Sequence, residues 1–232
     1  MTVPNPRIVA LVPAYNEGAR VAAVVTGARR HLPVLVVDDG STDDTAAQAS
    51  AAGAELLRQV PNQGKGAALR AGFRRALAAD CAAVVTLDAD GQHDPAEIPA
   101  FLARFAAGGA ELVIGARDFR GMPPVRRFAN TVGRRCFSWA VGHDVRDNQS
   151  GYRLVGRRLM AAMLESTEHG FEFEVEMIVV CVQRGFRLDW VPIRTIYGDE
   201  KSHIRKAHHV KHFFRLVWQT RRSTRAVRRA GT

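Results

Sequence analysis

Residues 7–44 read RIVALVPAYNEGARVAAVVTGARRHLPVLVVDDGSTDD, and this stretch decides the fold class. Two continuous apolar runs, Arg7–Pro13 and Pro33–Val37, have the length and composition of buried strands. Each is followed by a stretch with helical periodicity, Glu17–Arg30 and Asp43–Ala52, and the second of these opens with acidic residues that can cap a helix. Continuous apolar strands that alternate with helices indicate a parallel sheet that is covered on both faces.

The same alternation continues along the chain. Further strands are predicted at Ala54–Arg58, Ala82–Leu87 and Glu111–Gly115, and further helices at Gly64–Ala79, Pro95–Ala107, Pro124–Val141, Phe171–Arg184 and His208–Arg222. We therefore expect an α/β fold with a mostly parallel sheet, helices on both faces and a basic amphipathic helix at the C-terminal end.

Length and composition narrow the class of protein. The chain has 232 residues, of which 47% are hydrophobic and 24% charged, which excludes a disordered, collagen-like or low-complexity protein. No apolar run approaches the roughly 18 residues of a membrane-spanning helix, and residues 1–6 lack a signal-peptide pattern, so a cytoplasmic protein is expected. Three distant cysteines, Cys81, Cys136 and Cys181, indicate reduced thiols rather than a disulfide framework or a zinc site.

Positive charge is concentrated at the C-terminal end. The net charge is +10, and residues 201–232 alone hold ten basic residues and no acidic one. Such a tail indicates an anionic partner, either nucleic acid or a membrane surface with acidic lipid. Within His208–Arg222, Phe213, Phe214 and Trp218 lie opposite the basic side chains, which favours an interfacial helix on anionic lipid over a helix that docks on the core.

The predicted helix Pro124–Val141 is also basic and amphipathic. It carries the pairs Arg126-Arg127 and Arg134-Arg135, with Phe128, Val132, Phe137 and Val141 on or near one face. Two interpretations stay open for it: a helix that packs on the core with a solvated basic side, or a helix that faces lipid phosphate.

Polar residues follow three of the predicted strands at the points where these strands end. The first strand ends in PAYNE (residues 13–17), the second in DDGSTD (38–43) and the fourth in DADGQH (88–93). Ligands of parallel α/β sheets bind beyond the carboxyl ends of the strands. Singly, such residues form turns and helix caps, but together their carboxylates would repel unless a cation or a donor-rich ligand neutralises them.

Asp88-Ala89-Asp90 is the most informative of these stretches. Two carboxylates on a tight loop after a buried strand offer hard oxygen ligands to Mg²⁺ or Mn²⁺, and such a metal commonly bridges to a diphosphate. Gln92 or His93 can complete the coordination shell. The pattern therefore predicts a divalent metal site.

Other charged residues are predicted to be structural. Asn62–Gly66 lacks both the Ser or Thr after Lys65 and the upstream glycine of a phosphate-binding loop. A solvated Lys65 at a helix entry is therefore favoured over a Lys65 that contacts a ligand. Glu172 and Glu174 fall in the first turn of a predicted helix. Acids there suit the helix dipole and usually have no catalytic role, so both are kept only as secondary candidates.

Five motifs occur in order along the first half of the chain: PAYNE, VVDDGSTDDT, NQGKGAA, LDADGQHDP and GAR. This series resembles that of the family 2 inverting glycosyltransferases, which have the GT-A fold. Within that family, Asp147–Arg153 and the stretch from Val191 to His203 are similar to elements of polyprenyl-phosphate (dolichyl-phosphate) mannosyl- and glucosyltransferases. The resemblance implies a GT-A domain over residues 1–206 and a separate basic tail over 207–232.

The resemblance also implies roles for individual residues. The nucleotide sugar would be held by Pro13, Tyr15, Glu17, Asp38, Asp39, Asp88, Ala89, Asp90 and Lys201. Mg²⁺ or Mn²⁺ would be held by Asp88, Asp90 and Gln92, the acceptor by Gln149, Ser150 and Arg153, and the catalytic residues would be Asp90, Arg117 and Arg153. A divalent cation and arginines can stabilise the charge that builds on a leaving diphosphate, and a phosphate acceptor is already ionised, so no dedicated base is required.

The implied activity is the transfer of a hexose, with inversion, from a GDP-mannose or UDP-glucose type of donor to polyprenyl phosphate. Such an enzyme would be cytoplasmic and peripheral on the inner face of the membrane. One alternative is a family 2 transferase whose acceptor is a soluble glycan or a small molecule. A second is a non-enzymatic nucleic-acid-binding protein, but it leaves the strand-end carboxylates unexplained and no recognition motif supports it, so no nucleic-acid partner is expected.

Overall fold

The computed structural model describes residues 6–117, 124–170, 172–194 and 221. Its strands are β1 (Ile8–Ala14), β2 (Val34–Asp38), β3 (Glu55–Arg58), β4 (Ala83–Thr86), β5 (Ala110–Arg117), β6 (Arg153–Gly156) and β7 (Arg187–Ile193). Its helices are α1 (Gly18–Ala28), α2 (Thr45–Ala51), α3 (Lys65–Ala78), the short 3₁₀ turn η1 (Pro95–Glu97), α4 (Ile98–Ala106), α5 (Pro124–Val141), α6 (Arg157–Met163) and α7 (Glu172–Gln183). The elements predicted within the described ranges are all present, which confirms the α/β fold class.

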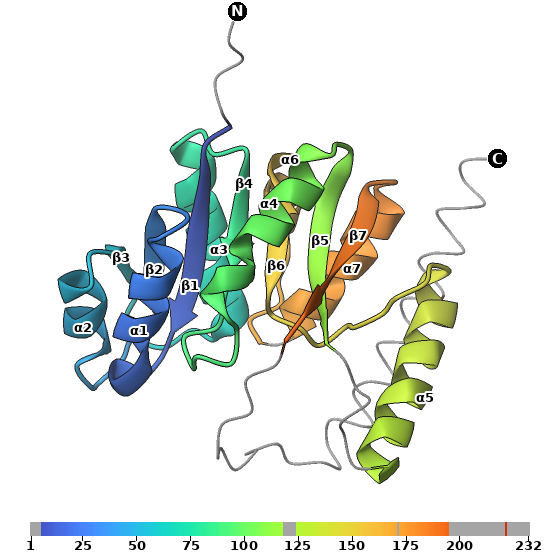
Figure 1. Cartoon of the computed structure of the whole chain (residues 1–232), viewed down its shortest axis with the longest axis horizontal. Helices are drawn as coiled ribbons and strands as arrows, with labels where there is room; N and C mark the ends of the chain where they lie inside the picture. The colour runs from blue at the N-terminus through green and yellow to red at the C-terminus, as the bar shows by residue number, and fades with distance from the viewer. Residues whose placement is uncertain (1–5, 118–123, 171, 195–220, 222–232) are drawn as a thin grey trace, which may run out of the picture.

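The seven strands form one sheet in the order β3-β2-β1-β4-β6-β5-β7 (Figure 1). Strand β6 is antiparallel to both of its neighbours, β4 and β5, and the other neighbouring strands pair in parallel. The carboxyl ends of the parallel strands therefore share one edge of the sheet with the first residue of β6. In register, Arg153 of β6 lies between Thr86 of β4 and Ile114 of β5 at this edge.

The buried strands divide their side chains between two apolar clusters, one on each face of the sheet. In β1, Val9 and Leu11 join the cluster formed with α3, α6 and α7, whereas Ala10 and Val12 join the cluster formed with α1, α2 and α4. This alternation follows from the two-residue period of a strand. In Figure 1, α1 and α4 lie in front of the sheet and α3 and α7 behind it. The prediction of helices on both faces is confirmed.

Three elements, β6, α6 and β7, were not predicted from the sequence. Strand β6 has only four residues, RLVG, and β7 reads RLDWVPI, in which Asp189 and Pro192 interrupt the apolar pattern. Such strands have no clear periodic signal and depend on pairing with β4 and β5. The predicted helix His208–Arg222 lies outside the described residues, apart from Arg221. Of the helices in the described ranges, none has the length and apolar character needed to cross a membrane.

Candidate active site at the carboxyl edge of the sheet

The turn that follows β4 presents Asp88 and Asp90 at the carboxyl edge of the sheet. Asp90 accepts a hydrogen bond at Oδ1 from the backbone N–H of Gln92 at 3.0 Å, and Gly91 takes a positive φ of 78° that closes the turn. The backbone N–H of Asp88 donates to Nδ1 of His93 at 3.2 Å. Burial lowers the pKa of His93, so its imidazole is neutral and supports the turn rather than adding a charge.

Lys65 is the unexpected member of this site. Its ammonium Nζ lies 2.5 Å from Asp88 Oδ1 and 3.2 Å from Glu174 Oε1, and its side chain is only 17% exposed. The prediction of a solvated lysine is therefore wrong. The reason is topological: Lys65 begins α3, the crossover between β3 and β4, and such a helix starts at the carboxyl edge of the sheet.

The ion pair fixes the charge of both partners. Burial alone would raise the pKa of Asp88, but the Lys65 ammonium lowers it to about 2. Burial alone would lower the pKa of Lys65, but the carboxylates of Asp88 and Glu174 raise it. Asp88 and Lys65 are therefore both charged at neutral pH.

Glu174 is buried beside Lys65, with 7% of its side chain exposed. Although it stands in the first turn of α7, it faces the sheet edge and forms an ion pair, so a helix-dipole role alone does not describe it. Gly151 shows how closely the two carboxylates approach. A Cβ added there would lie 2.7 Å from Asp88 Oδ2 and 3.0 Å from Glu174 Oε1, so any side chain at that position would force these carboxylates to shift.

Lys65, which was predicted to be solvated, and Glu174, which was only a secondary candidate, share a signal in the sequence. Lys65 is followed at the helical spacings i+3, i+4 and i+7 by the buried residues Ala68, Leu69 and Gly72. Glu174 is followed at the same spacings by the buried residues Met177, Ile178 and Cys181. A charged residue on the buried stripe of a helix indicates a buried charge with a partner.

Arg153, predicted to be catalytic and to bind the acceptor, is fully buried at the start of β6. Its Nε donates to the carbonyl oxygen of Ser150 at 2.7 Å, and its Nη1 donates to the carbonyl oxygen of Glu174. Among the described residues, Nη2 has no hydrogen-bond partner. Of the other predicted acceptor residues, Ser150 is buried and Gln149 is exposed. In this structure Arg153 thus holds the backbone beneath the site.

Arg117, the third predicted catalytic residue, stands at the end of β5. Its Nε and Nη2 donate to the two carboxylate oxygens of Asp147 at 2.7 and 3.0 Å. A two-point pair of this kind fixes the plane and direction of the guanidinium. The backbone N–H of Gln149 donates to the same carboxylate at 3.0 Å, so Asp147 also shapes the predicted acceptor loop.

The residues predicted to hold the nucleotide follow β1 and β2. Pro13 and Asp38 are buried, and Tyr15 has 48% of its surface exposed. Glu17 forms an ion pair with Arg20 at 3.1 Å. The remaining ones lie elsewhere: Ala89 is buried in the turn after β4, and Lys201 lies outside the described residues.

Asp39 has a different environment from its neighbours. Its Oδ1 accepts from the backbone N–H of Gln63 at 2.8 Å and from Gln59 Nε2 at 2.6 Å, and its Oδ2 accepts from the backbone N–H of Gly64 at 2.7 Å. Asp39 therefore ties the turn after β2 to the residue that precedes Lys65.

The donor set at this edge fits a divalent cation that is shared with a phosphate ligand. Within the described ranges no three His, Cys, Asp or Glu side chains gather closely enough to hold a metal by themselves. Asp88 and Asp90 supply hard carboxylate oxygens at the mouth of the turn, and a nucleotide diphosphate brings further oxygens of its own. This is the arrangement expected of a metal that is not held in an all-protein cage.

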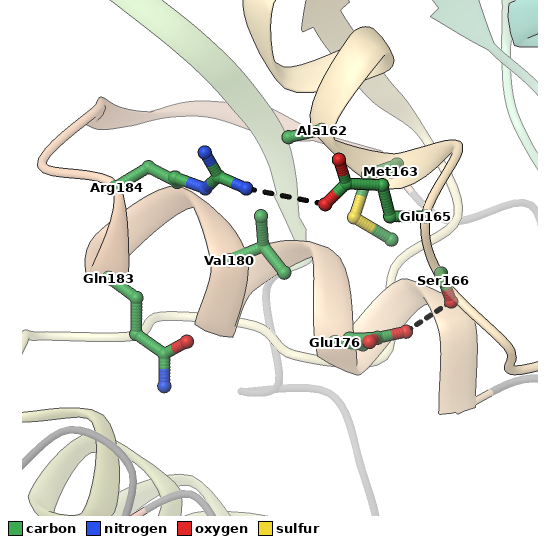
Figure 2. Close-up of a pocket in the computed structure, with 8 residues that line it drawn as sticks. All are labelled: Ala162, Met163, Glu165, Ser166, Glu176, Val180, Gln183 and Arg184. Carbon is green, nitrogen blue, oxygen red and sulfur yellow. Dashed lines mark hydrogen bonds and ion pairs between the residues drawn. The ribbon is translucent and has the colours of Figure 1, made fainter. Parts of the chain in front are cut away.

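A pocket of about 410 Å³ lies against α6 and α7 (Figure 2). Its lining comprises Ala162, Met163, Glu165, Ser166, Glu176, Val180, Gln183 and Arg184. A hydrogen bond from Ser166 Oγ to Glu176 and an ion pair of 3.5 Å between Arg184 and Glu165 cross it. It holds none of the predicted site residues.

The fold and the strand-end carboxylates agree with one family of enzymes, whose model, described as Glycosyl transferase family 2, matches residues 9–165. The chain belongs to glycosyl transferase family 2. It is therefore a glycosyltransferase, and the resemblance noted in the sequence is confirmed. Glu174 lies beyond the matched residues.

Several curated proteins are similar to this family 2 transferase. Glycosyltransferase AglJ of Haloferax volcanii is 36% identical over 197 residues, which cover 82% of this chain and 63% of AglJ. The undecaprenyl-phosphate mannosyltransferase of Micrococcus luteus is 33% identical over 205 residues, which cover 81% of this chain and 82% of that enzyme. The polyprenol monophosphomannose synthase of Mycolicibacterium smegmatis is 31% identical over 210 residues, covering 82% and 77%.

A solved structure shares the fold of this transferase. Glucosyl-3-phosphoglycerate synthase from Mycobacterium tuberculosis, in complex with Mn²⁺, uridine diphosphate and phosphoglyceric acid, aligns with a TM-score of 0.71 at 22% identity. The alignment covers 95% of this chain and 78% of the synthase. The predicted GT-A fold is thereby confirmed.

Proposed function

We propose that this family 2 transferase moves a hexose from a nucleotide diphosphate sugar, of the GDP-mannose or UDP-glucose type, to polyprenyl phosphate, with inversion and with Mg²⁺ or Mn²⁺. The observation that carries the proposal is the Asp88–Asp90 turn, which presents two carboxylates at the sheet edge next to the ends of β1 and β2. The relatives named undecaprenyl-phosphate mannosyltransferase and polyprenol monophosphomannose synthase support a lipid phosphate as acceptor.

The donor side is formed by the turns after β1, β2 and β4. Exposed Tyr15 can contact the nucleoside, and Asp38 and Asp39 shape the turn beside it. Asp88 and Asp90 would hold the divalent cation, with Gln92 next to them. When bound, that cation supplies positive charge that stabilises the leaving nucleoside diphosphate. The solved neighbour that contains Mn²⁺ and uridine diphosphate supports this reading.

The acceptor side is formed by the end of β5 and the loop before β6. Asp147 fixes the guanidinium of Arg117 in direction, and an oriented guanidinium can bind phosphate oxygens in two-point geometry. Arg153 holds the carbonyl oxygens of Ser150 and Glu174, so it would position the acceptor loop from beneath. Because a phosphate acceptor is ionised near neutral pH, no group of the chain needs to remove a proton from it.

An exposed apolar and basic face of α5 is consistent with a lipid acceptor. On α5, Val132 and Trp139 are 40% and 59% exposed, and Arg135 stands between them on the same helical face. The guanidinium of Arg221 lies 4.6 Å from the centre of the Trp139 ring. Aromatic and basic groups on one face suit a headgroup layer with acidic lipid. We propose that the protein acts at the cytoplasmic face of the membrane and that residues 207–232 add a basic tail to this contact.

The acceptor proposal is tested by direct assay. The full chain, with Mg²⁺ or Mn²⁺, is incubated with labelled GDP-mannose or UDP-glucose and one of three acceptors: a short polyprenyl phosphate, phosphoglyceric acid or a free glycan. We expect labelled product with polyprenyl phosphate. Product with phosphoglyceric acid or the glycan, and none with the lipid phosphate, would overturn the proposal.

The membrane surface has its own test. Trp139→Ser should weaken co-sedimentation with anionic vesicles severalfold without lowering the melting temperature, because the side chain is largely exposed. Phe137→Ser, on the buried side of the same helix, is the contrasting variant and should lower the melting temperature. Unchanged vesicle binding by Trp139→Ser would remove α5 from the membrane contact.

A further inference from the structure

Lys65 is bound to the carboxylate that the proposed metal needs. Its Nζ lies 2.5 Å from Asp88 Oδ1, so the ammonium occupies one of the two carboxylate oxygens that a divalent cation would bind. A cation that takes Oδ1, or both oxygens of Asp88, competes with the ammonium, because like charges repel in a partly buried site. A displaced ammonium that stays buried needs another anionic partner.

Glu174 is that partner, and it is already in contact. Its Oε1 lies 3.2 Å from Lys65 Nζ, and its side chain is 7% exposed. The positions around Gly151 show that the distance between the two carboxylates is short, since a single point there lies within 3.0 Å of an oxygen of each. A change of side-chain rotamer in Lys65 is enough to shift its ammonium from both carboxylates to Glu174 alone.

The backbone around Glu174 is held in place. Arg153 Nη1 donates to the carbonyl oxygen of Glu174, and Arg153 Nε donates to the carbonyl oxygen of Ser150, which precedes Gly151. The guanidinium of Arg153 therefore joins the segment that carries Glu174 to the segment that carries Gly151.

We propose that Glu174 is a positioning residue that takes up the Lys65 ammonium when a divalent cation binds Asp88. The site then holds two separate ion pairs, metal with Asp88 and ammonium with Glu174. Without metal, the Lys65 ammonium is shared between the two carboxylates. This inference rests on the proposed metal dependence, and it assigns to Lys65 and Glu174 control of the metal affinity.

The test is the dissociation constant of Mn²⁺ for the full chain without donor, measured from the electron paramagnetic resonance signal of free Mn²⁺. Glu174→Gln removes the second partner of Lys65, so Mn²⁺ affinity should fall about tenfold. Lys65→Met removes the competing ammonium, so affinity should rise about tenfold. Lys65→Gln, which can still donate hydrogen bonds to both carboxylates, replaces Lys65→Met if that variant does not fold.

The double variant decides between exchange and a general effect of charge. In the Lys65→Met background no ammonium is present, so Glu174→Gln cannot leave an ammonium without a partner. If Lys65 moves to Glu174, the substitution should change the dissociation constant of Mn²⁺ in this background by less than about twofold. A general effect of charge would weaken binding about tenfold in both backgrounds and would overturn the exchange.

Glu176→Gln is the matched control. It removes the same charge from the same helix, but its carboxylate accepts a hydrogen bond from Ser166 (Figure 2) rather than contacting Lys65. Its dissociation constant should stay within about twofold of the unmodified chain, and a tenfold change would overturn the special role of Glu174. If the unmodified chain binds no Mn²⁺ either alone or with UDP or GDP added, the proposed metal dependence fails and the exchange fails with it. If it binds Mn²⁺ and the variant effects are additive, only the exchange fails.

Discussion

The turns after β2 and β4 both present carboxylates at the same edge of the sheet, but they hold them in different ways. Asp39 accepts hydrogen bonds from the backbone N–H groups of Gln63 and Gly64. Asp88 instead forms an ion pair with the side chain of Lys65. A backbone donor can be withdrawn only if its loop moves, whereas a side chain can turn away. The comparison indicates that the β2 turn serves the architecture and that the β4 turn can exchange its partner for a ligand.

The largest effect is expected in the β4 turn. Asp90→Asn keeps an oxygen that can accept from the Gln92 N–H, so the turn should fold, but it removes an anionic metal ligand. We expect kcat/KM for transfer to fall by about a hundredfold or more, with little change in melting temperature. Chelation with EDTA should silence the unmodified enzyme. Near-normal turnover by Asp90→Asn at ordinary metal levels would contradict the metal assignment.

In the β2 turn, Asp39→Asn should act on stability. The amide has one accepting oxygen, so its NH₂ group would face an N–H donor of Gln63 or Gly64 in a nearly buried place. We expect a loss of about 2 kcal/mol in the free energy of unfolding, or roughly thirtyfold in the folding equilibrium. Urea unfolding without metal measures it. Asp88→Asn, measured in the same buffer, should lose less free energy of unfolding, because Lys65 keeps its ion pair with Glu174. A larger loss for Asp88→Asn than for Asp39→Asn would contradict the comparison.

Arg153→Lys extends the comparison to a buried cation that holds backbone carbonyl groups. A lysine keeps the charge but has a single nitrogen, so it cannot hold both Ser150 and Glu174 in the fork geometry. Transfer should fall about tenfold while nucleotide binding persists. Steady-state kinetics and a nucleotide-binding titration on the same preparation measure the loss of transfer and the nucleotide affinity separately. Equal loss of nucleotide binding would place Arg153 on the donor side.

The smallest effect concerns pH. The folded pKa of Asp88 is about 2, below the roughly 3.9 of an unfolded aspartate. A lowered pKa stabilises the folded state above the unfolded value, and that stabilisation is lost as pH falls through the folded value. The stability difference between the unmodified chain and Asp88→Asn should be constant above about pH 5 and shrink between about pH 4 and 2. Urea unfolding with a chelator measures it, and a difference that grows on acidification would contradict the ion pair.

The sequence alone was sufficient for the first part of the fold. From β1 to β5, apolar strands and amphipathic helices alternate with clear periodicity, and the parallel arrangement follows from this alternation. The β6 strand was missed because four residues carry no period of their own. It forms because the neighbouring strands β4 and β5 offer unpaired backbone groups on either side.

The candidate site was predictable in its carboxylates but not in their partners. Asp88 and Asp90 are visible as a motif at a strand end, whereas Lys65 and Glu174 come together from α3 and α7 only through tertiary packing. From helix position alone, Lys65 was predicted to be solvated and Glu174 to interact with the helix dipole. Their place on the buried stripes of both helices was the available sign that each charge needs a partner.

The antiparallel strand β6 has a mechanical consequence. In the sheet it lies between the block β3-β2-β1-β4 and the pair β5-β7, and its four residues supply the pairing on both sides (Figure 1). Within the sheet, the two blocks are joined through this short ladder. A substitution that weakens the pairing of β6 would therefore shift the proposed donor residues after β4 relative to the proposed acceptor residues after β5.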